Sequence, residues 1–237
     1  MTIAPRRLAL LALSMLAAAP AEAAGRPVVV ELFTSQSCSS CPPAEAVLAE
    51  LAAGDRDVLP LAFHVTYWDH LSWRDTYSLP EATARQRAYA AKLGDSVYTP
   101  QAVIDGRRGL VGSSAGAVRA AVSRARDGAV AEAPVRLVRG ESGLVVHLGA
   151  GTGVDRGGAT VTLVGFDPSR TTQVPRGENA GRTIVQANVV RSVREIGRWS
   201  GQADTLTAAW PAGEAAAVLV QAADGRVLGA ARLGPTS

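Results

Sequence analysis

The segment Pro27–Phe33 (PVVVELF) and the segment Ser37–Pro43 (SCSSCPP) that follows it decide the fold of this chain. The first is short, apolar and rich in β-branched residues, which is typical of a buried strand. Residues Ala44–Ala53 combine Ala, Glu and Leu in a helical pattern, and Gly54 follows where a helix commonly ends. We therefore expect the two cysteines of the second segment to lie on a turn from strand to helix.

Cys38 and Cys41 are the only cysteines in the 237 residues. Two thiolates alone cannot make a four-ligand zinc site, and a bridge between them closes too short a loop to constrain the unfolded chain much. The pair therefore indicates thiol–disulfide chemistry. The N-terminus of a helix stabilises a thiolate through unpaired N–H groups and the helix dipole. We expect Cys38 to be the more exposed, attacking sulfur and Cys41 to resolve the mixed disulfide.

The first 23 residues have the pattern of a secretory signal peptide. Arg6 and Arg7 precede an apolar run over Leu8–Ala19, and Ala21–Ala23 (AEA) supplies small residues for cleavage. The apolar run is shorter than the roughly 20 residues of a membrane span. The sequence thus predicts a periplasmic or secreted protein with no membrane span after cleavage, in a compartment where disulfides persist.

Further elements are expected between the cysteines and residue 127. A strand over 58–65 carries Pro60, which suggests an exposed start or an edge strand. A helix over 80–93 follows, then a strand over 98–104 that begins at a proline, a short returning strand over 109–112 and a helix over 114–126. With the first strand and helix, the predicted order is β-α-β-α-β-β-α.

This order, with C-x-x-C after the first strand and a proline opening the third, resembles the thioredoxin fold. Six short segments are also similar in sequence to a family of secreted bacterial thioredoxin-like proteins whose function is not established. The segments that carry this resemblance are Glu31–Gln36 (ELFTSQ), Cys38–Pro43 (CSSCPP), Tyr67–Asp69 (YWD), Trp73–Asp75 (WRD), Arg85–Arg87 (RQR) and Tyr98–Gln101 (YTPQ).

The resemblance implies supporting residues around the cysteines. It implies a cis peptide bond at Pro100, with Thr99 before it and both beside the disulfide. Glu31 is a rough positional match for the buried acid of thioredoxins, but it is displaced by about one residue, which reverses the side of a strand that a residue faces. The alternative is a hydrogen-bonded or edge glutamate. Ser39-Ser40 between the cysteines and Pro42-Pro43 after them depart from ordinary thioredoxins.

The stretch 64–75 (HVTYWDHLSWRD) is too rich in large residues for a plain linker. Three interpretations stay open. It could form a substrate rim beside the disulfide, with Tyr67, Trp68, Asp69 and Trp73. It could cover the sheet edge, tied down by Asp69, Arg74 and Asp75. It could also supply metal ligands from His64, Asp69 or His70 to join the cysteines, since thiolate and imidazole together suit copper or zinc.

The second half has a different texture from the first. Seven short alternating runs between turns predict an antiparallel β-sandwich over 134–234, after a boundary at 129–134 and a first domain over 26–128. The seven runs are 135–138, 144–148, 159–166, 183–193, 205–210, 216–221 and 227–233. The polar loop Gly177–Thr183 (GENAGRT) is interpreted either as a structural loop or as a contact to the first domain or a partner.

Composition bounds the class of protein. Hydrophobic residues make up 47% and charged residues 19%, so the chain can bury a core, and its net charge is only +3. The basic residues are scattered, and no nucleic-acid-binding motif is present. We therefore expect an α/β thioredoxin-like domain followed by an antiparallel β-sandwich, with no nucleic-acid partner and, by default, a monomer.

The function expected from these features is that of an exported thiol–disulfide oxidoreductase. It would need no cofactor and would act on an unidentified protein thiol or disulfide, together with an unidentified redox partner. Two alternatives remain open. One is a non-enzymatic interaction module with an inert disulfide, and the other is a copper- or zinc-binding protein that uses the same two thiolates.

Overall fold

The computed structural model describes residues 25–54, 56–128 and 132–235. The predicted signal peptide at 1–23 and positions 129–131 of the predicted boundary lie outside the described residues. The first half has the predicted order β-α-β-α-β-β-α. Its elements are β1 (Val28–Thr34), α1 (Pro42–Gly54), β2 (Val58–His64), α2 (Pro80–Leu93), β3 (Gln101–Ile104), β4 (Arg108–Val111) and α3 (Ala115–Asp127).

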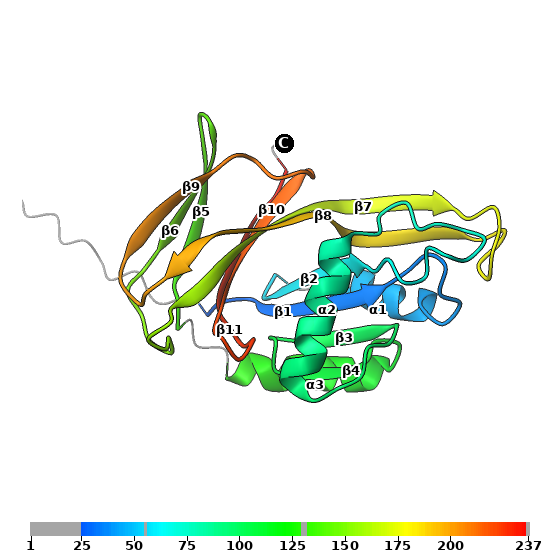
Figure 1. Cartoon of the computed structure of the whole chain (residues 1–237), viewed down its shortest axis with the longest axis horizontal. Helices are drawn as coiled ribbons and strands as arrows, with labels where there is room; N and C mark the ends of the chain where they lie inside the picture. The colour runs from blue at the N-terminus through cyan, green and yellow to red at the C-terminus, as the bar shows by residue number, and fades with distance from the viewer. Residues whose placement is uncertain (1–24, 55, 129–131, 236–237) are drawn as a thin grey trace, which may run out of the picture.

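The second half contains the seven predicted strands. They are β5 (Val135–Gly140), β6 (Gly143–Leu148), β7 (Ala159–Gln173), β8 (Thr183–Trp199), β9 (Asp204–Ala208), β10 (Ala215–Gln221) and β11 (Val227–Leu233). β7 and β8 are longer than the sequence pattern suggests, with 15 and 17 residues. They form a long antiparallel hairpin that extends along the whole first half (Figure 1).

One mixed sheet of eight strands runs through both halves, in the order β11-β10-β7-β8-β2-β1-β3-β4. β5, β6 and β9 form a separate three-stranded antiparallel sheet. Four of the seven strands expected to make their own sandwich thus continue the sheet of the first half. The physical reason is that β8 covers the otherwise open edge of β2, which pairs with β1 on its other side.

Pro60 lies inside the sheet, so the expectation of an exposed or edge position is wrong. Every residue of β2 is buried, and the contact with β8 is a parallel pairing at Ala62 and Val189. The side-chain amide of Asn188 donates a 2.8 Å hydrogen bond to the carbonyl oxygen of Pro60. A side chain therefore satisfies a backbone group that regular strand pairing leaves unpaired at this point.

Alternation along β1 separates two cores on the two faces of the sheet. Val30 and its even-numbered neighbours pack with α1 and α3. Val29 and Phe33 pack with α2, through Phe63 and Tyr89. A third core, with Trp199 fully buried, lies between the small sheet and strands of the large one. No helix in the described part of the chain is both long and apolar enough to cross a membrane.

Candidate functional site

Cys38 and Cys41 form a disulfide on the turn from β1 to α1, with their Cα atoms 5.4 Å apart. The predicted placement of the pair is confirmed. The turn is closed by backbone hydrogen bonds from Cys38 N–H to the Ser35 carbonyl and from Cys41 N–H to the Cys38 carbonyl. Both cysteines are 0% exposed, whereas Ser39 and Ser40 between them are exposed. The expectation that Cys38 is the more exposed sulfur is therefore wrong.

The start of α1 offers fewer free N–H groups than expected. Pro42 and Pro43 open the helix and have no N–H to donate. The next two N–H groups, of Ala44 and Glu45, donate to the carbonyl of Cys41 at 2.9 and 3.1 Å. These positions therefore offer no free N–H group to a Cys38 thiolate.

A chain of side-chain donors leads to the sulfur of Cys38 instead. The indole N–H of Trp68 donates to Thr99 Oγ1 at 2.8 Å, and Thr99 Oγ1 lies 3.4 Å from Cys38 Sγ. Because the Thr99 oxygen accepts from Trp68, its own proton is free to point at the sulfur. Ser40 Oγ also lies 3.4 Å from Cys38 Sγ. The Thr99–Pro100 peptide bond is cis, the isomer that the resemblance implies.

The aromatic loop at 64–75 lies beside the disulfide and is tied down by its own hydrogen bonds. Trp68 and Trp73 reach the disulfide loop, defined here as Gln36–Ser39. Trp68 reaches it through Thr99, and Trp73 through a 3.0 Å hydrogen bond to Gln36 Oε1. Asp69 ties the loop down by accepting from the Asp75 N–H and from the hydroxyl of Ser78. The Tyr67 ring packs at a tilt on Trp68, with centroids 6.2 Å apart.

Glu31 is not brought together with the cysteines. It faces α2, whereas α1 lies on the other face of the sheet. Its fully buried carboxylate is held by the guanidinium of Arg85 and by the Tyr89 hydroxyl, the latter at 2.5 Å. Glu31 thus fits the alternative expectation of a hydrogen-bonded glutamate, for the predicted reason that its position in the strand points it away.

Glu45 is the buried acid on the cysteine side. It lies four residues after Cys41, which places the two side chains on one face of the helix start. Glu45 Oε1 accepts from Thr34 Oγ1 at 2.8 Å and from Gln186 Nε2 at 3.3 Å. Its Oε2 is buried and has no hydrogen-bond partner among the described residues. Burial raises the pKa of Glu45 above 4.5, which favours the protonated acid.

Beside Glu45, His64 and Asp75 form a fully buried pair, with Nδ1 and Oδ2 2.7 Å apart. Burial alone would lower the pKa of His64, but the Asp75 carboxylate raises it above the ordinary 6.5. Burial alone would raise the pKa of Asp75, but His64 and the N–H donors of Gln36 and Tyr77 hold it below 3.8. Asp75 thereby ties the disulfide loop, through the Gln36 N–H at 2.7 Å, to a buried charge pair.

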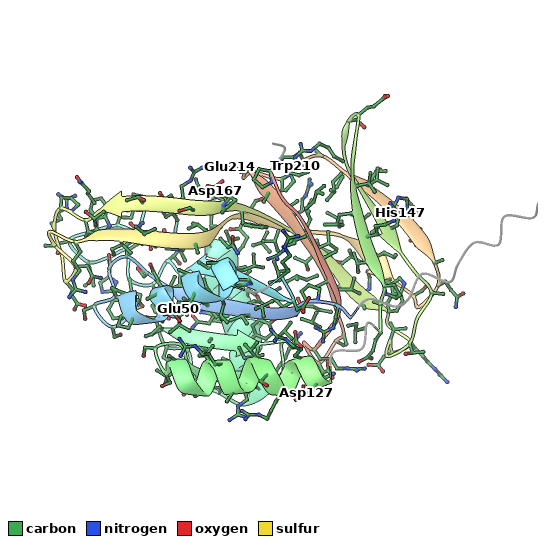
Figure 2. The ribbon with its side chains drawn as sticks, turned by 180° about the vertical axis from the view of Figure 1, so that it is seen from behind. Glu50, Asp127, His147, Asp167, Trp210 and Glu214 are labelled. Carbon is green, nitrogen blue, oxygen red and sulfur yellow. A yellow bond between two sulfur atoms is a disulfide. The ribbon has the colours of Figure 1, made fainter. Side chains whose placement is uncertain are left out.

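The residues proposed as metal ligands are occupied by other contacts. His64 Nδ1 meets Asp75, and its Nε2 lies 3.2 Å from Gln186 Nε2. His70 Nδ1 lies 2.9 Å from the carbonyl of Tyr67. The third histidine, His147, lies on the small sheet, at the opposite end of the molecule from the tip of the β7–β8 hairpin (Figure 2). Within the described ranges, no group of three or more His, Cys, Asp and Glu side chains could hold a metal ion.

The loop at the tip of the β7–β8 hairpin contacts the disulfide loop. Asn179 Nδ2 donates to the carbonyls of Gln36 and Cys38, each at 2.9 Å, and Glu178 Oε2 accepts from the Ser39 N–H at 3.1 Å. Of the two interpretations of Gly177–Thr183, the contact to the first half is therefore confirmed. Glu45 and Gln186 are two residues of the site that were not expected from the sequence. The signal for Glu45 is its spacing from Cys41, whereas the sequence carries no signal for Gln186.

Comparisons with known proteins place the chain in a family without assigning an activity. A crystal structure of an Agrobacterium tumefaciens protein is 31% identical, with a TM-score of 0.77 over 90% of this chain and 96% of that chain. The structure of HBP35 of Porphyromonas gingivalis is 14% identical, with a TM-score of 0.63 over 89% of this chain and 76% of that one, which is a likeness of fold alone. No functionally curated protein matches the chain. Residues 29–221 match a family described as proteins of unknown function, and the chain belongs to this family, DUF1223.

Proposed function

We propose that this protein is an exported thiol–disulfide oxidoreductase with a thioredoxin-like first half. The observation that carries the proposal is the donor chain from Trp68 through Thr99 to the sulfur of Cys38. Charge-assisted hydrogen bonds to a thiolate lower its pKa, and the thiolate is the nucleophile in disulfide exchange. The element order and the position of the disulfide directly before α1 also support a thioredoxin-like assignment.

In the reducing direction, the Cys38 thiolate attacks one sulfur of a substrate disulfide. The substrate S–S bond breaks, and the departing thiolate takes up a proton from solvent. The Cys41 thiolate then attacks Cys38 in the mixed disulfide, releases the second substrate thiol and restores the Cys38–Cys41 bond, so the substrate gains two electrons. The reverse sequence oxidises a substrate dithiol. Thr99 acts on Cys38 in both directions. The Cys38 thiolate is the attacking group in the reducing direction and the leaving group in the oxidising direction.

A trapping experiment tests this mechanism. With Cys41→Ala, the mixed disulfide between Cys38 and a substrate protein cannot be resolved. It should accumulate in extracts of the periplasm or of the secreted fraction. Cys38→Ala is the matched control and should trap none. Thr99→Val should raise the pKa of the Cys38 thiol, measured from the pH dependence of its alkylation rate in reduced Cys41→Ala protein. Absence of any Cys38 adduct, or an unchanged thiol pKa in the Thr99 variant, would contradict the mechanism.

The burial of both cysteines favours a second candidate, an interaction module whose disulfide is inert. A redox titration in glutathione buffers separates the two. A midpoint between about −120 and −230 mV is typical of exchange catalysts, whereas a midpoint below about −300 mV is typical of structural disulfides in secreted proteins. We expect the first result.

Export is part of the proposal and is supported by the signal-peptide pattern of residues 1–23. Fractionation of cells that express the full chain should recover a shortened protein outside the cytoplasm. Full-length protein in the cytoplasm, with its cysteines reduced, would contradict both the proposed export and the oxidised resting state.

A further inference from the structure

We propose that Glu178 and Asn179 form a latch that holds the disulfide loop, which carries Cys38, in a closed state. Release of this latch controls attack on Cys38. The loop held is Gln36–Ser39. The inference rests on the proposed function, to which it adds a role for the second half of the chain. The starting observation is that a nucleophile must reach the sulfur of Cys38, and this residue is 0% exposed. Exchange therefore requires the disulfide loop to move.

The latch acts on the backbone of that loop. Asn179 is 1% exposed and donates to the carbonyls of Gln36 and Cys38, one on each side of Ser37. Glu178, which is exposed, accepts from the next N–H, that of Ser39. Three hydrogen bonds from two adjacent residues thus span the loop. All three come from residues about 140 positions further along the chain.

The tip is built to hold its shape while it engages or releases the loop. Val174 is buried and exchanges backbone hydrogen bonds with the returning strand, from its own N–H to Arg182 and from the Gly181 N–H to its carbonyl. Gly177 and Gly181 both have positive φ, at 86° and 77°, a conformation open mainly to glycine. The tip therefore presents Glu178 and Asn179 from a compact turn closed by its own backbone hydrogen bonds.

The exposure of Glu178 favours a latch over a purely structural contact. Glu178 lies on the surface and contributes little to a core, yet it binds the N–H adjacent to Cys38. Asn179 Oδ1, by contrast, is buried and finds no donor among the described residues. A buried unsatisfied acceptor disfavours the closed state, so closure is poised to be reversible.

The experiment measures the rate at which dithiothreitol reduces the Cys38–Cys41 disulfide in the mature protein, with alkylation to quench the reaction. In this step the reductant thiolate attacks Cys38, the Cys38–Cys41 bond breaks and Cys41 leaves as the thiolate. The second thiol of the reductant then releases Cys38. Asn179→Asp is close to isosteric and loses both donated hydrogen bonds. It should speed reduction about 4- to 170-fold, since each of the two bonds contributes a factor of roughly 2 to 13.

A second pair of variants keeps the test decisive if Asn179→Asp unfolds. Glu178→Ala should speed reduction about 2- to 10-fold, whereas Glu178→Gln keeps an acceptor and should stay within about twofold of the unmodified protein. Arg176→Ala, on the exposed part of the same tip, is the control for general loosening and should also stay within about twofold. Equal rates for Glu178→Ala, Glu178→Gln and the unmodified protein would overturn the latch.

The outcome is separable from that of the proposed function. If the Glu178 pair differs as expected while Cys41→Ala traps no substrate, the latch stands as a guard on an inert disulfide, and the catalytic proposal fails. If Cys41→Ala traps substrate but the Glu178 and Asn179 variants are reduced at the unmodified rate, catalysis stands and the latch fails.

Discussion

Asp75→Asn should strongly destabilise the protein, because Asp75 is the buried counter-charge of His64. Both side chains are 0% exposed, and their contact is 2.7 Å. Asp75 Oδ2 also accepts from the Gln36 N–H at 2.7 Å, and Oδ1 accepts from the Tyr77 N–H at 2.8 Å. Each carboxylate oxygen faces a donor. Whichever way the Asn amide turns, its NH₂ group therefore meets an N–H group and one or more hydrogen bonds are lost.

The size of the loss depends on pH in a defined direction. The pKa of Asp75 is lowered, so its stabilisation is present above the ordinary value of 3.8 and is lost as pH falls through the lowered pKa. The pKa of His64 is raised, so its stabilisation is present below 6.5 and is lost as pH rises through the raised pKa. The pair therefore contributes most between these two ordinary values.

Urea unfolding followed by tryptophan fluorescence measures this contribution. At about pH 5, Asp75→Asn leaves a buried charge without its partner and should lower the free energy of unfolding by about 3–5 kcal/mol. Above the raised pKa of His64, the ring is neutral and the loss should shrink to about 1–3 kcal/mol, the scale of lost hydrogen bonds to a buried donor.

Asp69→Asn is the matched control, because Asp69 lies in the same loop and pairs with an Arg74 side chain that is 81% exposed. An Asn at this position keeps an oxygen for the Asp75 N–H, and its amide can donate to the Ser78 hydroxyl, which has the Asp75 carbonyl as an acceptor. It should cost less than about 1 kcal/mol at either pH. A loss below about 1 kcal/mol for Asp75→Asn at pH 5, or an equal loss at both pH values, would refute the buried-pair reasoning.

Two further predictions test other parts of the structure. Glu45→Gln should stabilise the protein increasingly as pH rises above the ordinary 4.5, because the raised pKa of Glu45 costs stability once Glu45 ionises in the unfolded chain. Thermal unfolding of both proteins across pH measures this gain. A stability difference that stays constant with pH would contradict the raised pKa. Gly106→Ala should cost more than Gly94→Ala. Both glycines have φ near +65°, but a Cβ at Gly106 would lie 1.9 Å from the Gly225 carbonyl, and one at Gly94 would meet nothing within 4 Å. Gly94→Ala should cost about 1–2 kcal/mol, and equal losses in chemical denaturation would argue against tight docking of the two turns.

Local sequence patterns predicted the elements of the first half well, because each element depends on a short run of consecutive residues. Pro80 and Gly94 bracket α2, and its observed bounds are the predicted ones. α1 begins at Pro42 and not at Ala44, since a proline suits the first helical position, where no N–H is needed. The alternation of β1 also predicted the outcome for Glu31. A shift of one residue reverses the face of a strand, and Glu31 does face away from the cysteines.

The long-range contacts of the site could not be predicted in this way. Glu45, His64 and Gln186 meet under the disulfide loop from a helix, a strand and a distant hairpin. Each is an ordinary polar residue in its own segment. Nothing local distinguishes a polar side chain that will be buried among partners from one that will face solvent, because the partners lie up to 141 residues away.

By itself, the sequence determined the disulfide pair, the helix that follows it and the order of the elements, since short-range spacing and backbone preference suffice for these. Only the tertiary structure decided that Cys38 is buried, that Glu45 is the acid on its side of the sheet, and that the β7–β8 hairpin reaches the disulfide loop. The physical reason is that β8 pairs with the open edge of β2, and this one pairing carries the hairpin across the first half. Edge pairing is satisfied by any compatible strand, so its choice depends on the whole folded chain.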